Sequence, residues 1–195
     1  MRRGSWPLLA LCFAAAGITP TGVLLVSVVA AVLLVRQPKR LGIMLALAVV
    51  ASAPWLTAAT LGGSGTSDPA GVTAFAARAE PGLGTLGSLA GLGGIWNADA
   101  VPASRTSLFA LFGTVLFLAV VALGLPAMKR HPLLGLAAAA VAIAAFAATP
   151  PGISIGEWAV AHVPGTGLLR DTQKLLAPVV VLAASAFGAC SARVV

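Results

Sequence analysis

The sequence predicts an all-α fold, a polytopic helical membrane protein, and three observations support this class. First, 59% of the 195 residues are hydrophobic and only 9% are charged, whereas soluble domains usually carry about 25% charged residues. Second, the charged residues lie in short clusters between long runs that lack Asp, Glu, Lys and Arg. Third, several of these runs reach the roughly 18 apolar residues of a membrane-spanning helix. We therefore expect one transmembrane domain over residues 1–195, in the plasma membrane.

The apolar material divides into six segments, each of which we expect to be helical. They cover residues 6–18, 22–35, 41–60, 106–126, 133–149 and 175–192. Pro20 and Gly22 favour a turn between the first two segments, and each of these is short for a span. Residues 6–35 therefore form a thin hairpin, one broken helix or a re-entrant pair. A cleaved signal peptide is a further alternative, because Arg2 and Arg3 precede a short apolar run.

The basic residues predict the topology, because cytoplasmic loops of membrane proteins are enriched in Lys and Arg. Basic connections occur at residues 36–40 and 129–131. Placing both in the cytoplasm leaves the longer loops, 61–105 and 150–174, outside. A hairpin over residues 6–35 then makes both termini cytoplasmic. All five acidic residues fall outside, and the inner basic residues are Arg2, Arg3, Arg36, Lys39, Arg40, Lys129, Arg130 and Arg193.

Both outer loops are expected to contain short helices, and the first loop two of them. Asp68 and Pro69 are typical of a helix start, and apolar side chains follow at helical spacing: Val72, Phe75, Ala76 and Ala79. We expect Arg78 and Glu80 on the wetter side of this amphipathic helix, which ends at Glu80-Pro81-Gly82. The glycine-rich stretch at 82–94 is then expected to form a small helix packed among the spans.

Two groups of outer-loop residues are candidate site residues. Trp96, Asn97 and Asp99 stand together at a span border, where they form either an interfacial anchor with a helix cap or part of a substrate pocket. The other group is Arg170, Asp171 and Lys174, just before the last segment. On a helix, Arg170 and Lys174 share a face, and two cations at a membrane border can hold a lipid phosphate or pyrophosphate. Their alternative role is to anchor the chain by snorkelling to the interface.

The composition also excludes several kinds of partner. The net charge of +7 is spread between apolar runs rather than gathered on one soluble face, so we expect no nucleic-acid partner. Cys12 and Cys190 lie within apolar runs, where cysteines behave as small hydrophobic residues. Glu157 has no partner at metal-ligand spacing. We therefore expect no metal site and no cofactor, and the membrane bilayer as the principal partner.

Several outer-loop stretches resemble a group of actinobacterial polytopic membrane proteins. They are Ser67-Asp68-Pro69-Ala70-Gly71-Val72, Phe75-Ala76-Ala77-Arg78, Leu86-Gly87-Ser88-Leu89, Gly93-Gly94-Ile95-Trp96-Asn97 and Leu169-Arg170-Asp171-Thr172-Gln173-Lys174. The last is similar to the F/L-R-D-x-x-K outer-loop motif of that group, which resembles the C superfamily of glycosyltransferases. Those enzymes use a polyprenyl-phosphate-linked sugar on the outer face of the membrane. The resemblance covers most of the chain.

The resemblance implies a part of such an enzyme rather than the whole. In the superfamily the catalytic carboxylate usually lies in an early outer loop of a chain with more spans, so this sequence looks like a carboxyl-terminal half. A missing amino-terminal half or partner subunit is then expected, and no catalytic residue is assigned. The resemblance further implies that Arg170 and Lys174 stabilise the departing lipid phosphate.

Two other functions compete with the glycosyltransferase. Alanine- and glycine-rich segments suit a non-catalytic subunit of a membrane complex, because small residues allow close helix contact. A transporter-like protein is the other alternative, since Pro20 interrupts one apolar stretch and transporters commonly use broken helices. Ion-coupled transport also relies on ionisable residues inside spans, and the six segments have none in their interiors.

Overall fold

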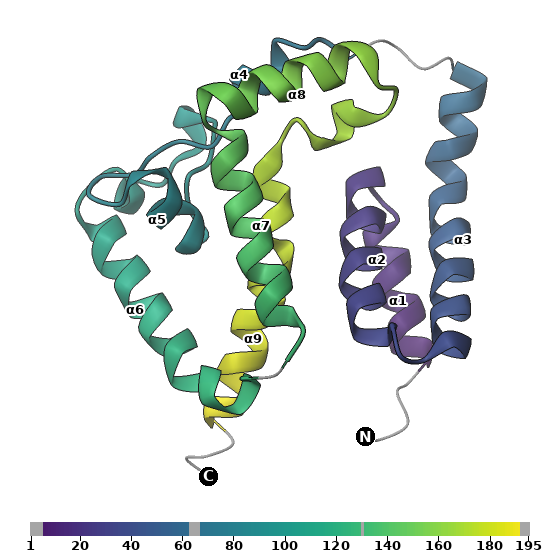
Figure 1. The fold of residues 1–195 in the computed structure, drawn as a ribbon, viewed down its shortest axis with the longest axis horizontal. Coiled ribbons are helices and arrows are strands. Elements are labelled where there is room, and N and C mark those ends of the chain that lie inside the picture. The colour runs from purple at the N-terminus through teal and green to yellow at the C-terminus, as the bar shows by residue number, and fades with distance from the viewer. Residues whose placement is uncertain (1–5, 63–66, 130, 192–195) are drawn as a thin grey trace. The chain divides into compact units, whose positions relative to one another are not determined.

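The computed structural model describes residues 6–62, 67–129 and 131–191, which form helices and connecting loops (Figure 1). The α-helices are α1 (Trp6–Ala16), α2 (Pro20–Leu34), α3 (Pro38–Gly62), α4 (Gly71–Ala74), α5 (Gly84–Ala90), α6 (Phe109–Gly124), α7 (Leu133–Ala147), α8 (Pro150–His162) and α9 (Ala177–Ser191). Short 3-10 helices are η1 (Ala98–Ala100), η2 (Ala103–Arg105), η3 (Leu125–Met128), η4 (Thr166–Leu169) and η5 (Thr172–Leu176). The prediction of an all-α fold is confirmed for these residues.

The chain divides into two compact units, Met1–Thr66 and Ser67–Val195. The first unit contains α1 to α3, and the second contains α4 to α9. Both candidate groups of site residues belong to the second unit.

In the first unit, α1 and α2 form a hairpin that packs against α3 (Figure 1). Phe13, Ala30 and Met44, one from each helix, are its buried core. Thr19 caps α2, because its Oγ1 accepts a hydrogen bond of 3.0 Å from the N–H of Gly22. The guanidinium of Arg40, at the start of α3, lies 5.8 Å from the ring centroid of Trp6, at the start of α1. Residues 6–35 therefore fold back on themselves rather than forming one broken helix.

In the second unit, α9 packs against both α6 and α7. The buried residues of α7 include small side chains at i, i+3 and i+7. They are Leu133, Ala137, Ala140 and Ala144 on α7 and Pro178, Val179, Leu182 and Ala186 on α9. Helix α6 approaches α9 closely at Gly124, where a Cβ would overlap the backbone of Ala186. Such close approach is typical of helices that associate within a bilayer.

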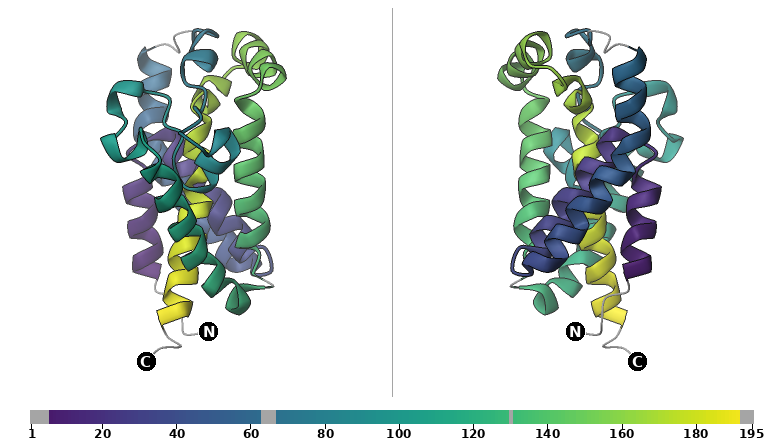
Figure 2. Two further views of the ribbon diagram at one scale, coloured as in Figure 1. Left: turned by 90° about the vertical axis from the view of Figure 1, so that its left-hand side faces the viewer. Right: turned by 90° about the vertical axis from the view of Figure 1, so that its right-hand side faces the viewer.

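The junction between α7 and α8 bends the chain by 89°. Thr149 is extended (φ −85°, ψ 157°), and its Oγ1 accepts a hydrogen bond of 3.3 Å from Gly152. Pro150 lacks an N–H and disfavours a helical conformation at the residue before it, so α7 ends and α8 starts in a new direction. Accordingly, α8 is seen lengthwise in Figure 1 and end-on in Figure 2.

The first outer loop is less helical than its periodicity predicts. Helix α4 ends at Ala74, so the expected amphipathic helix does not continue to Ala79. The expected cap by Asp68 is also wrong, because the N-cap of α4 is Ala70 and has no side-chain cap bond. Asp68 Oδ1 instead accepts a hydrogen bond of 3.0 Å from the N–H of Ala70, in the turn before the helix. Glu80 is 9% exposed, which makes the expectation of a wet Glu80 wrong. The small glycine-rich helix is present as α5, which packs against α6 and α7.

Within the described ranges, three helical stretches are long and apolar enough to cross a membrane: Pro38–Gly62, Phe109–Met128 and Thr172–Ser191. Helices α7 and α8 make a fourth only if the bent pair is counted as one span. Helices α1 and α2 have 11 and 15 residues, short of the roughly 20 that a span requires. The helical segments agree with the sequence, whereas six full-length spans are not shown.

Candidate functional site

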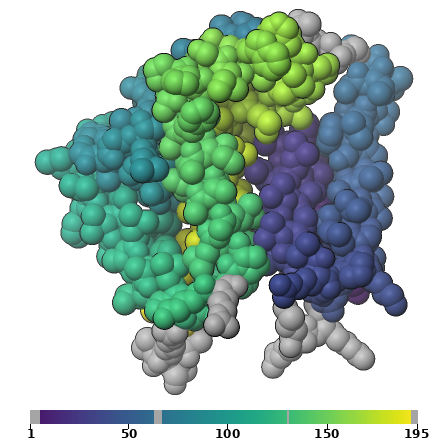
Figure 3. All heavy atoms as spheres, in the orientation of Figure 1, coloured from purple at the N-terminus to yellow at the C-terminus, as the bar shows by residue number. Residues whose placement is uncertain are grey.

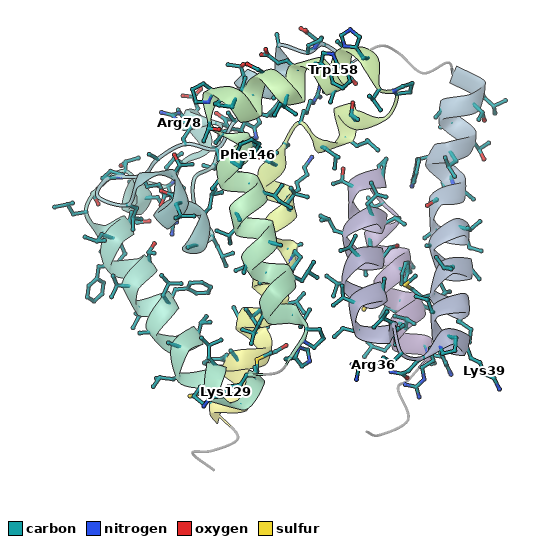
Figure 4. The ribbon with its side chains drawn as sticks, in the orientation of Figure 1. Arg36, Lys39, Arg78, Lys129, Phe146 and Trp158 are labelled. Carbon is teal, nitrogen blue, oxygen red and sulfur yellow. The ribbon has the colours of Figure 1, made fainter. Side chains whose placement is uncertain are left out.

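The polar residues of the second unit gather at one end of it. Arg78 and Trp158 lie at that end, and Lys129 lies at the opposite end, beyond α6 (Figure 4). The loop that follows α4 and the connection between α8 and α9 build the polar end, where α4 also packs on α8. Thr73 Oγ1 donates a hydrogen bond of 2.7 Å to Glu157 Oε1 and so ties these two helices together.

Arg170 is the best-placed cation of the predicted group. Its guanidinium lies 4.8 Å from the ring centroid of Phe75, a cation–π contact. The Phe75 ring in turn meets Trp96 edge-on, with centroids 4.3 Å apart. Gly71 lies beneath the Arg170 stem, since a Cβ there would stand 3.3 Å from Cδ. Among the residues that the structure describes, no carboxylate forms an ion pair with Arg170.

Gln173 joins the two predicted groups, and the sequence analysis missed it. Its Oε1 accepts a hydrogen bond of 3.2 Å from the N–H of Trp96, and its Nε2 donates one of 3.1 Å to the carbonyl of Gly93. One amide side chain thus bonds to the backbone at both Gly93 and Trp96, which lie 80 and 77 residues earlier in the chain. No local sequence pattern identifies a glutamine for this role, and the only signal is its position within the Arg170–Lys174 motif.

Asp171 and Lys174 form their own pair. The Nζ of Lys174 lies 3.5 Å from Asp171 Oδ2, and the Lys174 side chain is 53% exposed. Asp171 Oδ1 is buried without a hydrogen-bond partner among the described atoms. These residues do not lie on one helix, because η4 ends at Leu169 and η5 begins at Thr172. Arg170 and Lys174 therefore do not share a helix face.

Asn97 and Asp99 make local contacts. Asn97 Oδ1 accepts a hydrogen bond of 3.0 Å from the backbone N–H of Asp99 and thereby caps η1. The Asp99 side chain is exposed. Of the first predicted group, only Trp96 is linked to Arg170, because the Phe75 ring contacts both side chains. Arg170, Phe75 and Trp96 form the Arg170 cluster.

An ion pair with a buried carboxylate lies close to these residues, between Glu80 and Arg105. Arg105 Nε donates a hydrogen bond of 2.8 Å to Glu80 Oε1, and Nη2 lies 2.8 Å from Oε2. The Glu80 side chain is 7% exposed and also accepts a bond of 3.1 Å from Gly94 N–H. Sequence reasoning missed this pair because 25 residues separate its partners.

The ion pair forms one wall of a cavity of about 270 Å³. Its polar lining comes from Arg78, Glu80, Arg105 and Thr106, and its apolar lining includes Pro81, Ile95, Ala98 and Val101. This volume is just below the 300–1,000 Å³ that is typical of ligand pockets. A small charged group fits such a space.

An apolar groove of about 430 Å³ runs between α6 and α7, with α9 as its floor (Figure 3). The lining is hydrophobic throughout and includes Leu86 of α5, Phe117 and Val121 of α6, Ala138 of α7, and Val179 and Leu182 of α9. The α7 side of the lining includes three small alanines, Ala137, Ala138 and Ala142. A hydrocarbon tail is the chemistry that this lining suits.

Comparison of the chain with protein-family models, curated proteins and solved structures finds no match. The chemistry of the site therefore rests on its geometry alone. In the described part of the chain, no three His, Cys, Asp or Glu side chains lie close enough together to hold a metal ion. What the cluster offers is an arginine without a carboxylate partner, an aromatic surface and, on the same unit, an apolar groove.

Proposed function

We propose that the chain is a multi-pass protein of the plasma membrane, with both termini in the cytoplasm and the polar end of the second unit outside. The three long apolar helices support insertion. Lys129 and Arg78 lie at opposite ends of the second unit (Figure 4). This supports a topology in which the connections that carry them lie on opposite sides of the bilayer. The basic connection after α2 is cytoplasmic by the same rule.

At its outer face the protein binds a lipid-linked phosphate, as part of a glycosyltransferase that uses a polyprenyl-phosphate sugar. The observation that carries this proposal is the position of Arg170. Its guanidinium is held against Phe75, no carboxylate pairs with it among the described residues, and it lies two residues before the last candidate span, Thr172–Ser191. A guanidinium at this depth is suited to a phosphate at the membrane surface, which it can bind through two parallel N–H groups.

Two further features near Arg170 suit a lipid phosphate, a second positive charge for the phosphate and an apolar groove for the hydrocarbon tail. Lys174 adds a positive charge, although Asp171 offsets part of it. The apolar groove reaches α9 at Val179, and helical rise places this residue about 8 Å along the chain axis from Lys174. During sugar transfer, negative charge grows on the departing phosphate, and Arg170 is placed to stabilise it.

Binding of farnesyl phosphate by the purified protein tests the site, with farnesol as the ligand that lacks only the phosphate. A hydrogen bond to a charged group contributes about 1.5–3 kcal/mol. We therefore expect R170A to weaken farnesyl phosphate binding by roughly ten- to a hundredfold, and K174A by less, because its side chain is largely exposed. The matched control is K129A, which removes one positive charge at the opposite end of the unit (Figure 4).

The comparison between ligands and variants decides the proposal. Equal affinity for farnesyl phosphate and farnesol, or equal losses in R170A and K129A, contradicts a phosphate site at Arg170. Release of free polyprenyl phosphate from a polyprenyl-phosphate sugar then separates an enzyme from a non-catalytic subunit. Only the enzyme breaks the glycosidic bond.

A further inference from the structure

The cavity beside the Glu80–Arg105 ion pair has a rigid wall. The N–H of Glu80 donates a hydrogen bond of 2.8 Å to Ser88 Oγ, which itself donates one of 2.6 Å to the carbonyl of Gly84. Ser88 is fully buried. At Gly93, a Cβ would overlap Arg105 Nη2 and both carboxylate oxygens of Glu80, so the backbone presses directly on the pair. The pair is therefore fixed before any ligand arrives, which lowers the entropic cost of binding.

The charges that line the cavity do not cancel. Glu80 is matched by Arg105 alone, while Arg78 also lines the cavity and is exposed. Arg78 has no ion-pair partner within the described ranges. The backbone of Arg78 is nevertheless anchored, because its N–H donates a hydrogen bond of 3.0 Å to the carbonyl of Gly94. The lining thus carries one net positive charge.

Arg105 retains unused hydrogen-bond donors. Its Nε and Nη2 are directed to Glu80, and Nη2 also donates a bond of 3.3 Å to the carbonyl of Gly91. A guanidinium has five N–H donors, and Nη1 has no bond to any described residue. The Arg105 side chain is 25% exposed and lines the cavity, so a ligand there can reach its guanidinium.

We propose that this cavity is a second anion site, which binds the phosphate of a phosphodiester through Arg78 and Arg105. A phosphodiester carries a single negative charge, which matches the single net charge of the lining. Glu80 is the positioning residue, because it fixes the plane of the Arg105 guanidinium. The apolar side of the cavity, with Ile95 and Val101, contacts the carbon substituent on the phosphate.

The site lies at the edge of a candidate span. Arg105 and Thr106 line the cavity and stand only a few residues before α6, with which the span Phe109–Met128 begins. Two sources of phosphodiester reach this level: the headgroup of a membrane phospholipid and a soluble phosphodiester. Arg170 is not among the residues that line the cavity, so this site goes beyond the proposed function and is independent of it.

Calorimetric titration of the purified full chain in non-ionic detergent tests the site, with dihexanoyl phosphatidylglycerol and tail-free glycerophosphoglycerol as probes. R78A is the principal variant, because Arg78 is exposed and the fold does not depend on its side chain. A98L fills the cavity without changing the charge, since Ala98 lines it. K129A removes the same charge as R78A at the far end of the unit (Figure 4).

We expect R78A to weaken binding of dihexanoyl phosphatidylglycerol at least about tenfold, A98L to weaken it similarly, and K129A to leave it unchanged. If glycerophosphoglycerol competes with dihexanoyl phosphatidylglycerol, the headgroup alone is sufficient for binding. If it does not compete, the ligand of the site is a membrane phospholipid. Equal losses in R78A and K129A, or full binding by A98L, overturn the cavity site. R170A separates the two proposals, because it weakens farnesyl phosphate binding and leaves this titration unchanged.

Discussion

Replacing Gly93 by alanine tests the central contact of the outer loop most severely. The new Cβ would occupy the space of Arg105 Nη2 and the Glu80 carboxylate. The backbone at Gly93 is packed and cannot move away from the new Cβ. The side chains of the ion pair must therefore move. Two hydrogen bonds to the Glu80 carboxylate are then lost or stretched, those from Arg105 Nε and from Gly94 N–H.

The expected destabilisation follows from the burial of the pair. Each hydrogen bond to a charged group contributes about 1.5–3 kcal/mol, and both side chains remain present to re-form part of the pair after they shift. The Glu80 side chain is only 7% exposed, so solvent can replace little of what is lost. We expect G93A to lower the free energy of unfolding by about 1.5–3 kcal/mol, which corresponds to a decrease in Tm of roughly 3–12 °C for a chain of this size.

Thermal unfolding of the purified protein in detergent, followed by tryptophan fluorescence, measures this effect. The matched control is G113A in α6, where a Cβ would meet no atom within 4 Å. An alanine for a helical glycine stabilises by about 0.4–1 kcal/mol, so G113A should unfold at the same temperature or slightly higher. Equal Tm values for G93A and G113A would refute the packed ion pair.

Two further substitutions test neighbouring contacts by the same unfolding assay. Q173A removes both hydrogen bonds that hold Gly93 and Trp96, so we expect a loss of about 1–3 kcal/mol; an unchanged Tm would show that the clamp is absent. G124A places a Cβ against the backbone of Ala186 and should cost about 1–3 kcal/mol through overpacking. If G124A lowers the Tm no more than an alanine at a helical glycine without neighbours does, the close contact of α6 with α9 is contradicted.

The helices were predictable from the sequence because apolar runs determine them locally. The expected segments at 133–149 and 175–192 correspond to α7 (Leu133–Ala147) and α9 (Ala177–Ser191). Pro20 and Gly22 also indicate the turn between the first two helices, which the structure has between α1 and α2. What hydropathy cannot supply is the angle between consecutive helices, and the 89° bend at α8 is therefore visible only in the structure.

The outer loop was predicted less well, because contacts between distant residues determine it. The spacing of Val72 and Phe75 favours a helix, yet α4 ends at Ala74. Phe75 instead packs against Trp96, and Glu80 turns inward to Arg105. Both partners lie more than 20 residues away in the sequence, beyond the reach of any periodicity.

The candidate site was predicted in composition but not in geometry. Arg170 and Trp96 do meet, through Phe75, although no sequence pattern connects them. Arg170 and Lys174 would share a face only on one helix, and this segment instead forms the two separate 3-10 helices η4 and η5. Gln173, between those two cations, makes the long-range hydrogen bonds of this segment.

The proposed topology is tested most directly by cysteine accessibility in intact cells. Cys12 and Cys190, both free thiols, are first replaced by serine, and single cysteines are then introduced as K39C or E157C. We predict that a membrane-impermeant maleimide labels E157C in intact cells and K39C only after permeabilisation. Labelling of both positions from the same side would contradict a chain that places its basic connections inside and its carboxylates outside.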